Sequence, residues 1–457
     1  MYDVAIIGGG PGGYAAALYA HNFGLSVVLI EKDEIGGTCL HRGCIPAKSW
    51  LQTAEVFTGV AGAAEFGVLA SEPNLDWAAA RDRKNRIVGQ LVKGLGGLLR
   101  GRKVDVVAGA GRLAPPGGVV VTAADRSEQR IEAANIILAT GSVPRTIPGY
   151  RIDGERIVTS DHALDWGRRP ERVAVIGAGA IGCEFASLLV DLGSTVHLFE
   201  MLDQILPGTD LDGAKVLDRA LRRRGVGVHT DTAVGPPTFT AEGVVVPFGE
   251  ESVTVDVVLV SVGRAPVIEG IGLGATRVEI EDGFITVDPA TMATAEPGVY
   301  AVGDIVAVTP QLAHAAFAEA MAAITHIATG SAAPVDPRAI PLIVYTHPEV
   351  ASVGLTEEAA RAAGYEVQTH SHGFGGVARA MIQGQNQGTV KIVSEVDGPI
   401  LGATVAGPQA GELIHELMFA VGWEAMPSEA AAFVHAHPTL AEAIGESLLS
   451  ASGRSLH

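Results

Sequence analysis

The 457-residue chain combines 47% hydrophobic residues with 18% charged residues and 58 glycines, a composition typical of a folded protein with many tight turns. This balance excludes a disordered chain, and the length predicts two to four domains because one hydrophobic core rarely serves so many residues. The formal net charge of -19, without basic clusters, argues against a nucleic-acid or anionic-membrane partner.

Hydropathy and cysteine content indicate in which compartment the protein is expected. No apolar run approaches the roughly 18 residues that span a bilayer, and an expected strand begins almost at Met1, so we expect no signal segment and no membrane contact. Three cysteines are too few for a secreted disulfide framework. We therefore expect a cytoplasmic protein, and no metal site is predicted.

The N-terminal segment is predicted to form a strand, a glycine-rich turn, a helix and a second strand that ends at Glu31. This pattern is a dinucleotide-binding fingerprint. Gly8 permits the tight turn, Gly10 lets backbone amides approach a pyrophosphate, and Gly13 allows the helix to pack on the strand. Glu31 is expected to accept hydrogen bonds from ribose hydroxyls.

Two cysteines, Cys39 and Cys44, follow the fingerprint within the segment Gly36–Lys48. We interpret them as a redox-active dithiol. Neighbours on one helix face lie three or four positions apart, so an i,i+5 pair requires a distorted turn, for which Gly43 and Pro46 are candidates. Taken alone, two buried cysteines that behave as small apolar residues would be the simpler interpretation.

A helical region is predicted from the dithiol to about Arg100, with core residues at Ile87, Leu91, Leu95 and Leu98. Short strands are expected between Val104 and Val121, and a buried strand at 136–139. A polar connector with a proline, 166–172, precedes the next strand.

The segment that follows the connector repeats the first pattern, with Gly177, Gly179 and Gly182 before a helix and Glu200 at the end of the next strand. Two complete fingerprints are far less probable by accident than one, so we predict that the chain binds two dinucleotides. A carboxylate at Glu200 pairs with a free 2′-hydroxyl and repels a 2′-phosphate, which favours NADH over NADPH.

The rest of the chain is predicted to contain a buried strand at 257–264, a strand ending at Asp304, and an alanine-rich helix from Leu312 to about Thr329. From about Pro341, short strands alternate with helices in a unit that has no nucleotide turn. His435 and His437 lie in this unit before a helix; taken alone, such a pair is usually structural.

Together, these features resemble the flavoprotein pyridine nucleotide-disulfide oxidoreductases over essentially the whole chain. The motifs that carry the resemblance appear in the family's order: Gly36-Gly37-Thr38-Cys39, Gly43-Cys44-Ile45-Pro46, Ala139-Thr140-Gly141, Ala301-Val302-Gly303-Asp304 and His435-Ala436-His437-Pro438-Thr439-Leu440.

The resemblance implies FAD at the first fingerprint and NAD at the second. It implies that Asp304 bonds the ribityl chain and that Lys48 pairs with Glu184 beside the flavin ring. The further cofactor-binding residues that it implies are Thr38, Gly111, Thr140, Gly141 and Ala313 for FAD, and Val234 and Gly263 for NAD.

The resemblance also implies an activity, the oxidation of protein-bound dihydrolipoamide to lipoamide with reduction of NAD+ through a Cys39–Cys44 disulfide. His437, oriented by Glu442, would be the base and would act on the dithiol of the opposite subunit of a homodimer. The implied partner is the lipoyl domain of a 2-oxoacid dehydrogenase complex or a glycine-cleavage carrier protein.

The implied fold class is α/β, with two Rossmann-like domains and a C-terminal α+β dimerisation domain. The expected boundaries are 1–148 for the FAD-binding domain with the dithiol, 149–270 for the NAD-binding domain, 271–340 for a central domain that completes the FAD site, and 341–457 for the interface domain.

The sequence leaves three alternative functions open. A reductase of another small disulfide, such as glutathione, is disfavoured by Glu200, since such enzymes usually use NADPH. A flavin-dependent NADH oxidase would not need both cysteines. An inactive scaffold flavoprotein would be expected to lack the cysteines or the base, and all three are present.

Overall fold

The computed structural model describes residues 1–456. The chain forms two compact units, each assembled from separated segments. The first unit comprises Met1–Ser49, Ala79–Arg145 and Arg264–Pro337, and the second comprises Trp50–Ala78, Thr146–Gly263 and the residues from Arg338 onward.

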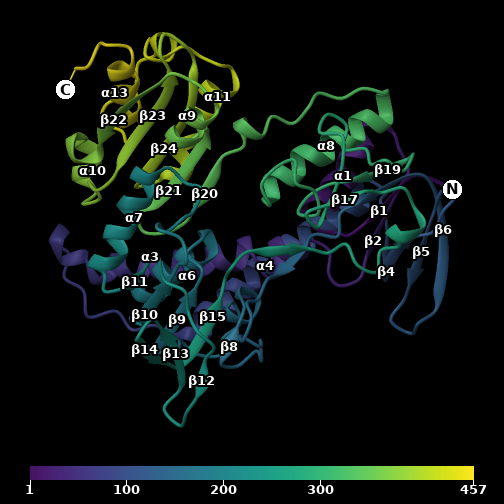
Figure 1. Cartoon of the computed structure of the whole chain (residues 1–457), viewed down its shortest axis with the longest axis horizontal. Coiled ribbons are helices and arrows are strands. Elements are labelled where there is room, and N and C mark those ends of the chain that lie inside the picture. The colour runs from purple at the N-terminus through teal and green to yellow at the C-terminus, as the bar shows by residue number, and fades with distance from the viewer. Residues whose placement is uncertain (457) are drawn as a thin grey trace. The chain divides into compact units, whose positions relative to one another are not determined.

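The first unit is built on a mainly parallel sheet of order β3-β2-β1-β6-β5-β4, in which β19 also pairs with β6 (Figure 1). The parallel strands run side by side because the helices that connect them lie on the faces of the sheet. The strands are β1 (Tyr2–Ile7), β2 (Val27–Glu31), β3 (Asp105–Ala108), β4 (Ala110–Leu113), β5 (Gly118–Thr122), β6 (Glu128–Leu138) and β19 (Val299–Ala301). Shorter pairs are β7 (Ser142–Pro144) with β16 (Arg264–Pro266), and β17 (Ile280–Glu281) with β18 (Phe284–Ile285).

Helices α1 (Pro11–Ala20) and α8 (Ala313–Thr329) pack together on one face of this sheet. Small residues make the close approach possible: a Cβ built on Gly12 would lie 3.6 Å from the Ala316 Cβ. The alanine-rich sequence of α8 therefore serves helix–helix packing. The other helices with residues in this unit are α2 (Gly37–His41), α3 (Cys44–Ala61) and α4 (Trp77–Gly101), and α3 and α4 also contribute residues to the second unit.

The second unit contains a parallel sheet of order β11-β10-β9-β15-β8 and an antiparallel three-stranded sheet of order β12-β13-β14. The strands are β8 (Ile157–Val158), β9 (Arg172–Ile176), β10 (Thr195–Phe199), β11 (Gly227–His229), β12 (Thr238–Phe239), β13 (Val244–Phe248), β14 (Glu251–Val255) and β15 (Val257–Val260). The helices are α5 (Ser160–Ala163), α6 (Ala180–Asp191) and α7 (Leu211–Arg223).

The C-terminal part of the second unit is an antiparallel sheet of order β20-β21-β24-β23-β22, covered by helices (Figure 1). Its strands are β20 (Leu342–Val344), β21 (Glu349–Gly354), β22 (Val367–Gly373), β23 (Thr389–Glu395) and β24 (Ile400–Gly407). Its helices are α9 (Glu357–Ala362), α10 (Ala378–Ile382), α11 (Ala410–Gly422), α12 (Pro427–Ala430) and α13 (Glu442–Ala451).

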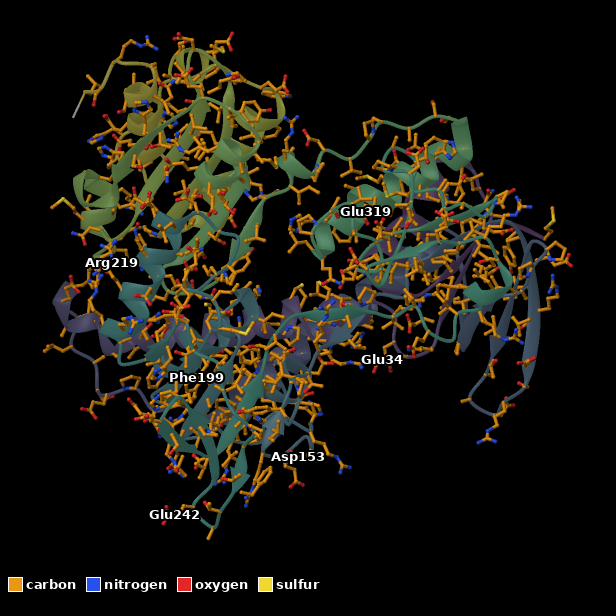
Figure 2. All side chains as sticks on the ribbon, in the orientation of Figure 1. Glu34, Asp153, Phe199, Arg219, Glu242 and Glu319 are labelled. Atoms are coloured by element: carbon orange, nitrogen blue, oxygen red, sulfur yellow. The ribbon has the colours of Figure 1, made fainter. Side chains whose placement is uncertain are left out.

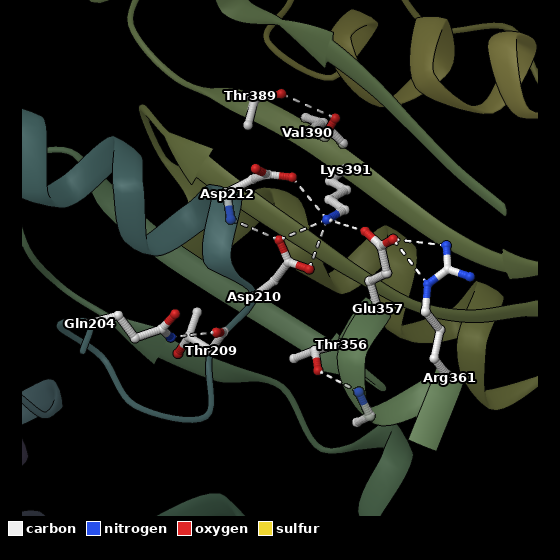
Figure 3. Close-up of polar contacts among 11 residues, drawn as sticks. Gln204, Thr209, Asp210, Asp212, Thr356, Glu357, Arg361, Thr389, Val390 and Lys391 are labelled. Carbon is white, nitrogen blue, oxygen red and sulfur yellow. Dashed lines mark hydrogen bonds and ion pairs between the residues drawn. The ribbon is translucent and has the colours of Figure 1, made fainter. Parts of the chain in front are cut away.

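A buried lysine joins the two parts of the second unit. The Lys391 ammonium on β23 lies 3.0 Å from Asp210, which caps α7, 2.8 Å from Asp212, and 2.9 Å from Glu357 on α9 (Figure 3). Helix α7 also packs closely on β24 beside these ion pairs. A Cβ on Gly213 would lie only 2.7 Å from the Thr404 side chain. Helix α7 is thereby attached to the C-terminal sheet.

The predicted α/β class, with two Rossmann-like sheets and a C-terminal α+β part, is confirmed. The predicted stripe of core residues in α4 is partly wrong: Leu95 is buried and Ile87 is half-buried, but Leu91 and Leu98 are exposed and Leu99 is buried instead. No helix within residues 1–456 has both the length and the apolar character that crossing a membrane requires.

Candidate functional site

The first glycine-rich turn has the geometry that a bound pyrophosphate requires. Gly8 has a φ of +106°, and a Cβ at either Gly8 or Gly13 would overlap a backbone carbonyl oxygen, of Ala139 and Gly8 respectively. Helix α1 then begins at Pro11, and its N-cap, Gly10, makes no side-chain capping bond. The amides of the first turn are therefore available to a phosphate.

Glu31, at the end of β2, is held against this turn. Its carboxylate accepts hydrogen bonds from the amides of Gly9 at 2.5 Å and Asp33 at 2.8 Å. The remaining acceptor capacity of the two oxygens fits the hydroxyls of a ribose.

The loop that leads to the dithiol packs directly on the first fingerprint. The Gly36 amide donates to the Gly9 carbonyl at 2.7 Å, and a Cβ on Gly37 would lie 2.6 Å from the Gly10 Cα. Both Gly36 and Gly37 have positive φ values. The glycine pair therefore brings the dithiol segment next to the nucleotide turn, a role that its sequence alone does not indicate.

The two cysteines lie on either side of a helix break. Cys39 is in α2, Cys44 is the first residue of α3, and the chain changes direction at Arg42 and Gly43. A Cβ on Gly43 would lie 3.0 Å from the Thr38 carbonyl oxygen, so glycine suits the break. The expected distortion is present, whereas Pro46 lies in the first turn of α3, where a missing amide costs little.

The electrostatics of the dithiol differ from those of an isolated thiol. A hydrogen bond with Cys44 is the largest effect that raises the pKa of Cys39, followed by burial and the Cys44 charge, while the positive charge of Lys48 opposes them. Burial, with smaller contributions from the two cysteines, raises the pKa of Tyr14 to about 12. Cys39 therefore retains its proton more strongly than an ordinary cysteine does.

Asp304 follows β19 and belongs to a polar group whose other members lie far away in the sequence. Its carboxylate accepts a hydrogen bond from Ser142 Oγ at 2.5 Å, and Arg264 Nε lies 2.7 Å from Ser142 Oγ and 4.0 Å from Asp304. Thr140 Oγ1 donates to the Val267 carbonyl at 2.6 Å. An arginine at the end of a buried apolar run was the one sequence signal for this group.

The remaining residues expected around the first nucleotide have varied surroundings. Gly141 has a φ of +72° and its carbonyl accepts the Val267 amide. Gly111 lies in β4, where a Cβ would come within 3.1 Å of Ile7 and Ile30, and Ala313 is the first residue of α8.

The second fingerprint repeats the geometry of the first. Gly177 has a φ of +96°, a Cβ on Gly182 would overlap the Gly177 carbonyl oxygen, and Gly179 is an N-cap for α6 without a side-chain bond. Glu200 accepts the amides of Ala178 at 2.8 Å and Leu202 at 3.0 Å.

Three more of the expected residues lie in the second unit. Val234 forms an isolated bridge with Phe248, and Gly263 has a φ of +101° just beyond β15. Glu184 on α6 is buried and accepts the Tyr345 amide at 3.0 Å. The expected pairing of Glu184 with Lys48 stays a prediction.

His437 and Glu442 form a hydrogen-bonded pair. His437 Nδ1 lies 2.7 Å from Glu442 Oε1, and the second carboxylate oxygen accepts the Thr439 amide at 2.9 Å. Burial would raise the pKa of Glu442, but the bonds from His437 and Thr439 lower it overall. The carboxylate therefore stays charged and orients the imidazole, whose side chain is 72% exposed.

A second imidazole–carboxylate pair holds the same loop. His435 Nε2 lies 2.7 Å from Glu416 Oε1 of α11, and this bond is the main cause of a raised pKa at His435. Gly445 gives the ring room, because a Cβ there would lie 2.6 Å from His435 Nδ1. The sequence did not identify Glu416, which lies on a different helix.

The geometry thus groups the expected residues by unit. The first unit contains one nucleotide turn, the dithiol and Asp304, and the second contains the other nucleotide turn, Glu184 and the His437–Glu442 pair. Within residues 1–456, no group of three or more His, Cys, Asp or Glu side chains is placed to hold a metal ion.

Comparison with known proteins gives matches over the full chain. The chain is 38% identical to a dihydrolipoyl dehydrogenase of Bacillus subtilis, and the match covers 100% of this chain and 99% of the relative. It is 40% identical to a dihydrolipoyl dehydrogenase of Chlorobaculum tepidum, and that match covers 99% of this chain and 97% of the relative. The crystal structure of LpdA from Mycobacterium tuberculosis, at 30% identity, superposes with a TM-score of 0.91 over 98% of this chain and 99% of LpdA.

Two family models account for most of the sequence. Residues 2–320 match the pyridine nucleotide-disulphide oxidoreductase model, and residues 340–448 match the dimerisation domain of the same family. With two nucleotide turns, a dithiol beside the first, and matches of this length, the chain belongs to the pyridine nucleotide-disulphide oxidoreductase family.

Proposed function

We propose that this protein is a dihydrolipoyl dehydrogenase, which oxidises protein-bound dihydrolipoamide to lipoamide and reduces NAD+ to NADH. The observation that carries the proposal is the packing of the dithiol segment on the first nucleotide turn, through the Gly36–Gly9 hydrogen bond and the contact of Gly37 with Gly10. This packing supports electron transfer between the sulfur pair and a flavin bound at that turn.

The residues of the first unit fit FAD. Uncapped amides at the start of α1 suit a pyrophosphate, Glu31 suits the adenosine ribose, and Asp304 suits the ribityl hydroxyls. Thr38, Lys48, Gly111, Thr140, Gly141 and Ala313 complete the proposed FAD site.

The second fingerprint fits NAD. Gly177, Gly179 and Gly182 would accommodate the pyrophosphate, and Glu200 would bond a free 2′-hydroxyl. Val234 and Gly263 would also lie beside the NAD, and Glu184 would pair with Lys48 beside the flavin ring. In domain terms, we propose 1–148 for FAD, 149–270 for NAD, 271–340 for completion of the FAD site, and 341–457 for the subunit interface.

The chain's own groups then carry out the sulfur chemistry. His437 accepts a proton from dihydrolipoamide, and the substrate thiolate attacks Cys39, breaking the Cys39–Cys44 disulfide and releasing Cys44 as a thiolate. The second substrate sulfur displaces Cys39 from the mixed disulfide, so cyclic lipoamide leaves and both cysteines are reduced. FAD, when bound, would take the electron pair from this dithiol and pass it to NAD+ as a hydride.

We further propose that the protein works as a cytoplasmic homodimer in which His437 serves the dithiol of the opposite subunit. The match to a dimerisation domain and the exposure of the His437 side chain support this arrangement. The partner would be a lipoyl domain of a 2-oxoacid dehydrogenase complex or a glycine-cleavage carrier protein.

Steady-state assays would test the proposed activity. We expect turnover of dihydrolipoamide with NAD+ and of lipoamide with NADH, and at least about tenfold lower kcat/KM with NADP(H), because the Glu200 carboxylate repels a 2′-phosphate. Preferential turnover of glutathione disulfide or coenzyme A disulfide with NADPH would contradict the proposal.

A further inference from the structure

A buried carboxylate on α8 has no role in the proposed chemistry. Glu319, labelled in Figure 2, is the single acidic residue of that alanine-rich helix. It is 0% exposed. Burying a carboxyl group is unfavourable unless hydrogen bonds compensate for the lost water. The partners of Glu319 therefore indicate what the residue does.

Both oxygens of Glu319 accept hydrogen bonds from the turn that follows β19. Glu319 Oε2 accepts the Gly303 amide at 2.6 Å, and Oε1 accepts the Thr309 hydroxyl at 2.7 Å. Gly303, with a φ of +79°, immediately precedes Asp304, and its carbonyl accepts the Val306 amide at 3.0 Å. One side chain thus fixes both ends of the segment 303–309.

Two opposing effects act on the Glu319 carboxyl group. Burial raises its pKa to about 7, with a smaller contribution from the Asp304 charge, while the bonds from Thr309 and Gly303 lower it. Because the Gly303 amide and the Thr309 hydroxyl both donate hydrogen bonds to Glu319, the bonding pattern suits a carboxylate better than a neutral acid.

We propose that Glu319 is a positioning residue of the flavin site, which holds the 303–309 segment so that the Asp304 carboxylate faces the ribityl chain of FAD. This inference rests on the proposed function, in which the first unit binds FAD. Glu319 acts through its neighbour, because its own oxygens are occupied by Gly303 and Thr309.

The geometry around Asp304 explains why its placement needs support. Ser142 of β7 donates a hydrogen bond to its carboxylate, Arg264 of β16 lies 4.0 Å from that carboxylate, and the Gln311 side chain donates to its carbonyl at 3.0 Å. None of these three contacts fixes the Gly303 amide, on which the position of the Asp304 backbone depends. Glu319 supplies that contact from α8.

FAD binding to the apoprotein, measured by quenching of FAD fluorescence, tests the inference without an activity assay. We expect Glu319→Ala to raise the FAD dissociation constant by about tenfold or more, since hydrogen bonds to a charged group are lost. Thr309→Val, which keeps the shape but loses one donor, should raise it by a smaller factor. Met321→Ala, an exposed position on the same helix, is the matched control and should bind FAD as the unsubstituted protein does.

A double-mutant cycle distinguishes positioning from a general loss of structure. If Glu319 acts through Asp304, Glu319→Ala should change the FAD affinity of an Asp304→Ala protein by less than about twofold. Effects of Glu319→Ala that are equal in both backgrounds would overturn the inference, and so would unchanged affinities for Glu319→Ala and Thr309→Val. Failure of the unsubstituted apoprotein to bind FAD would instead contradict the proposed function.

Discussion

Glu31 and Glu200 use their carboxylates in the same way, although they lie in different units. Each accepts the amide of the second residue of its own glycine-rich turn, Gly9 or Ala178, and an amide two positions further along its own loop. In the proposed function, these bonds would orient the acid before a nucleotide arrives, so less entropy would be lost on binding a ribose. The repetition supports the proposal that both turns bind a dinucleotide.

His437→Gln should separate the two half-reactions. The substitution removes the proposed proton acceptor of the dithiol step, so flavin reduction by dihydrolipoamide should slow by about 100-fold or more, while reduction by NADH should be unchanged. Stopped-flow absorbance of the flavin measures both rates. Equal slowing of the two would show that His437 is not the base, and Glu442→Gln should give an intermediate loss.

Residue positions that depend on local spacing were predictable from the sequence. The placement of the glycines in both turns, and of Glu31 and Glu200 at the ends of the following strands, follows from the strand–turn–helix pattern alone. Ser142, Arg264 and Glu416 were missed because their partners lie far away in the chain, and no local pattern indicates which polar residues meet.

At the scale of the element, substitutions in α1 and α6 are expected to weaken binding of the two proposed nucleotides independently. Gly182→Ala introduces a methyl group that overlaps the Gly177 carbonyl, and Gly13→Ala does the same at Gly8. Overpacking of about 1–3 kcal/mol should raise the KM for NADH about tenfold in Gly182→Ala while FAD stays bound. Gly13→Ala should lose FAD during purification.

Flavin content and NADH kinetics measure these outcomes. Gly89→Ala is the control, because its helical site in α4 has no atom within 4 Å of the added methyl group, and it should be neutral or slightly stabilising. Loss of FAD from Gly182→Ala would contradict the assignment of separate nucleotide sites.

The Lys391 network should contribute strongly to the stability of the second unit. Lys391→Met leaves Asp210, Asp212 and Glu357 without their shared cation, and removing one partner of a buried ion pair costs about 3 kcal/mol. Equilibrium unfolding in urea measures the change. Lys215→Met, on the exposed side of α7, should have almost no effect.

The contribution of Lys391 should also depend on pH. Burial opposes the charge of Lys391, but bonds to Asp212, Glu357 and Asp210 raise its pKa overall, so its stabilisation is complete below about pH 10 and declines above the folded-state pKa. The same bonds lower the pKa of Glu357, so stabilisation is lost as pH falls below about 4. The stability difference between the protein and Lys391→Met should therefore be largest between these limits, and a difference independent of pH would contradict the ion-pair account.

Helix α4 shows where element prediction fails. The periodic residues Leu91 and Leu98 correctly indicated a helix, but they are exposed in the single chain, whereas Leu95 and Leu99 pack inward. Periodicity identifies an apolar face, but it does not say which protein surface covers that face.

At the scale of the whole molecule, the proposed dimer predicts complementation. The test is a heterodimer, purified through two different tags, in which one subunit carries Cys44→Ser and the other carries His437→Gln. The first subunit keeps its His437–Glu442 pair and the second keeps its dithiol, so one intact dithiol faces one intact base across the interface. It should show about half of the unsubstituted activity, because one of two sites is complete. An inactive heterodimer would mean that each subunit uses its own base.

The order of the elements and the fold class could be predicted from the sequence, but the assembly of the units could not. Each unit collects segments from separated parts of the chain, such as residues 1–49 with 264–337. Strand β19 joins β6 across more than one hundred intervening residues, and such pairing leaves no local signal.

The central claim is that the Cys39–Cys44 pair exchanges electrons with a flavin bound at the first nucleotide turn. Anaerobic titration of the purified holoprotein with two electrons, followed by visible absorbance, tests it most directly. We predict a long-wavelength thiolate-to-flavin charge-transfer band that is absent from Cys44→Ser and retained in Cys183→Ser, whose sulfur is buried on α6. A titration without that band, or an unchanged band in Cys44→Ser, would contradict the account.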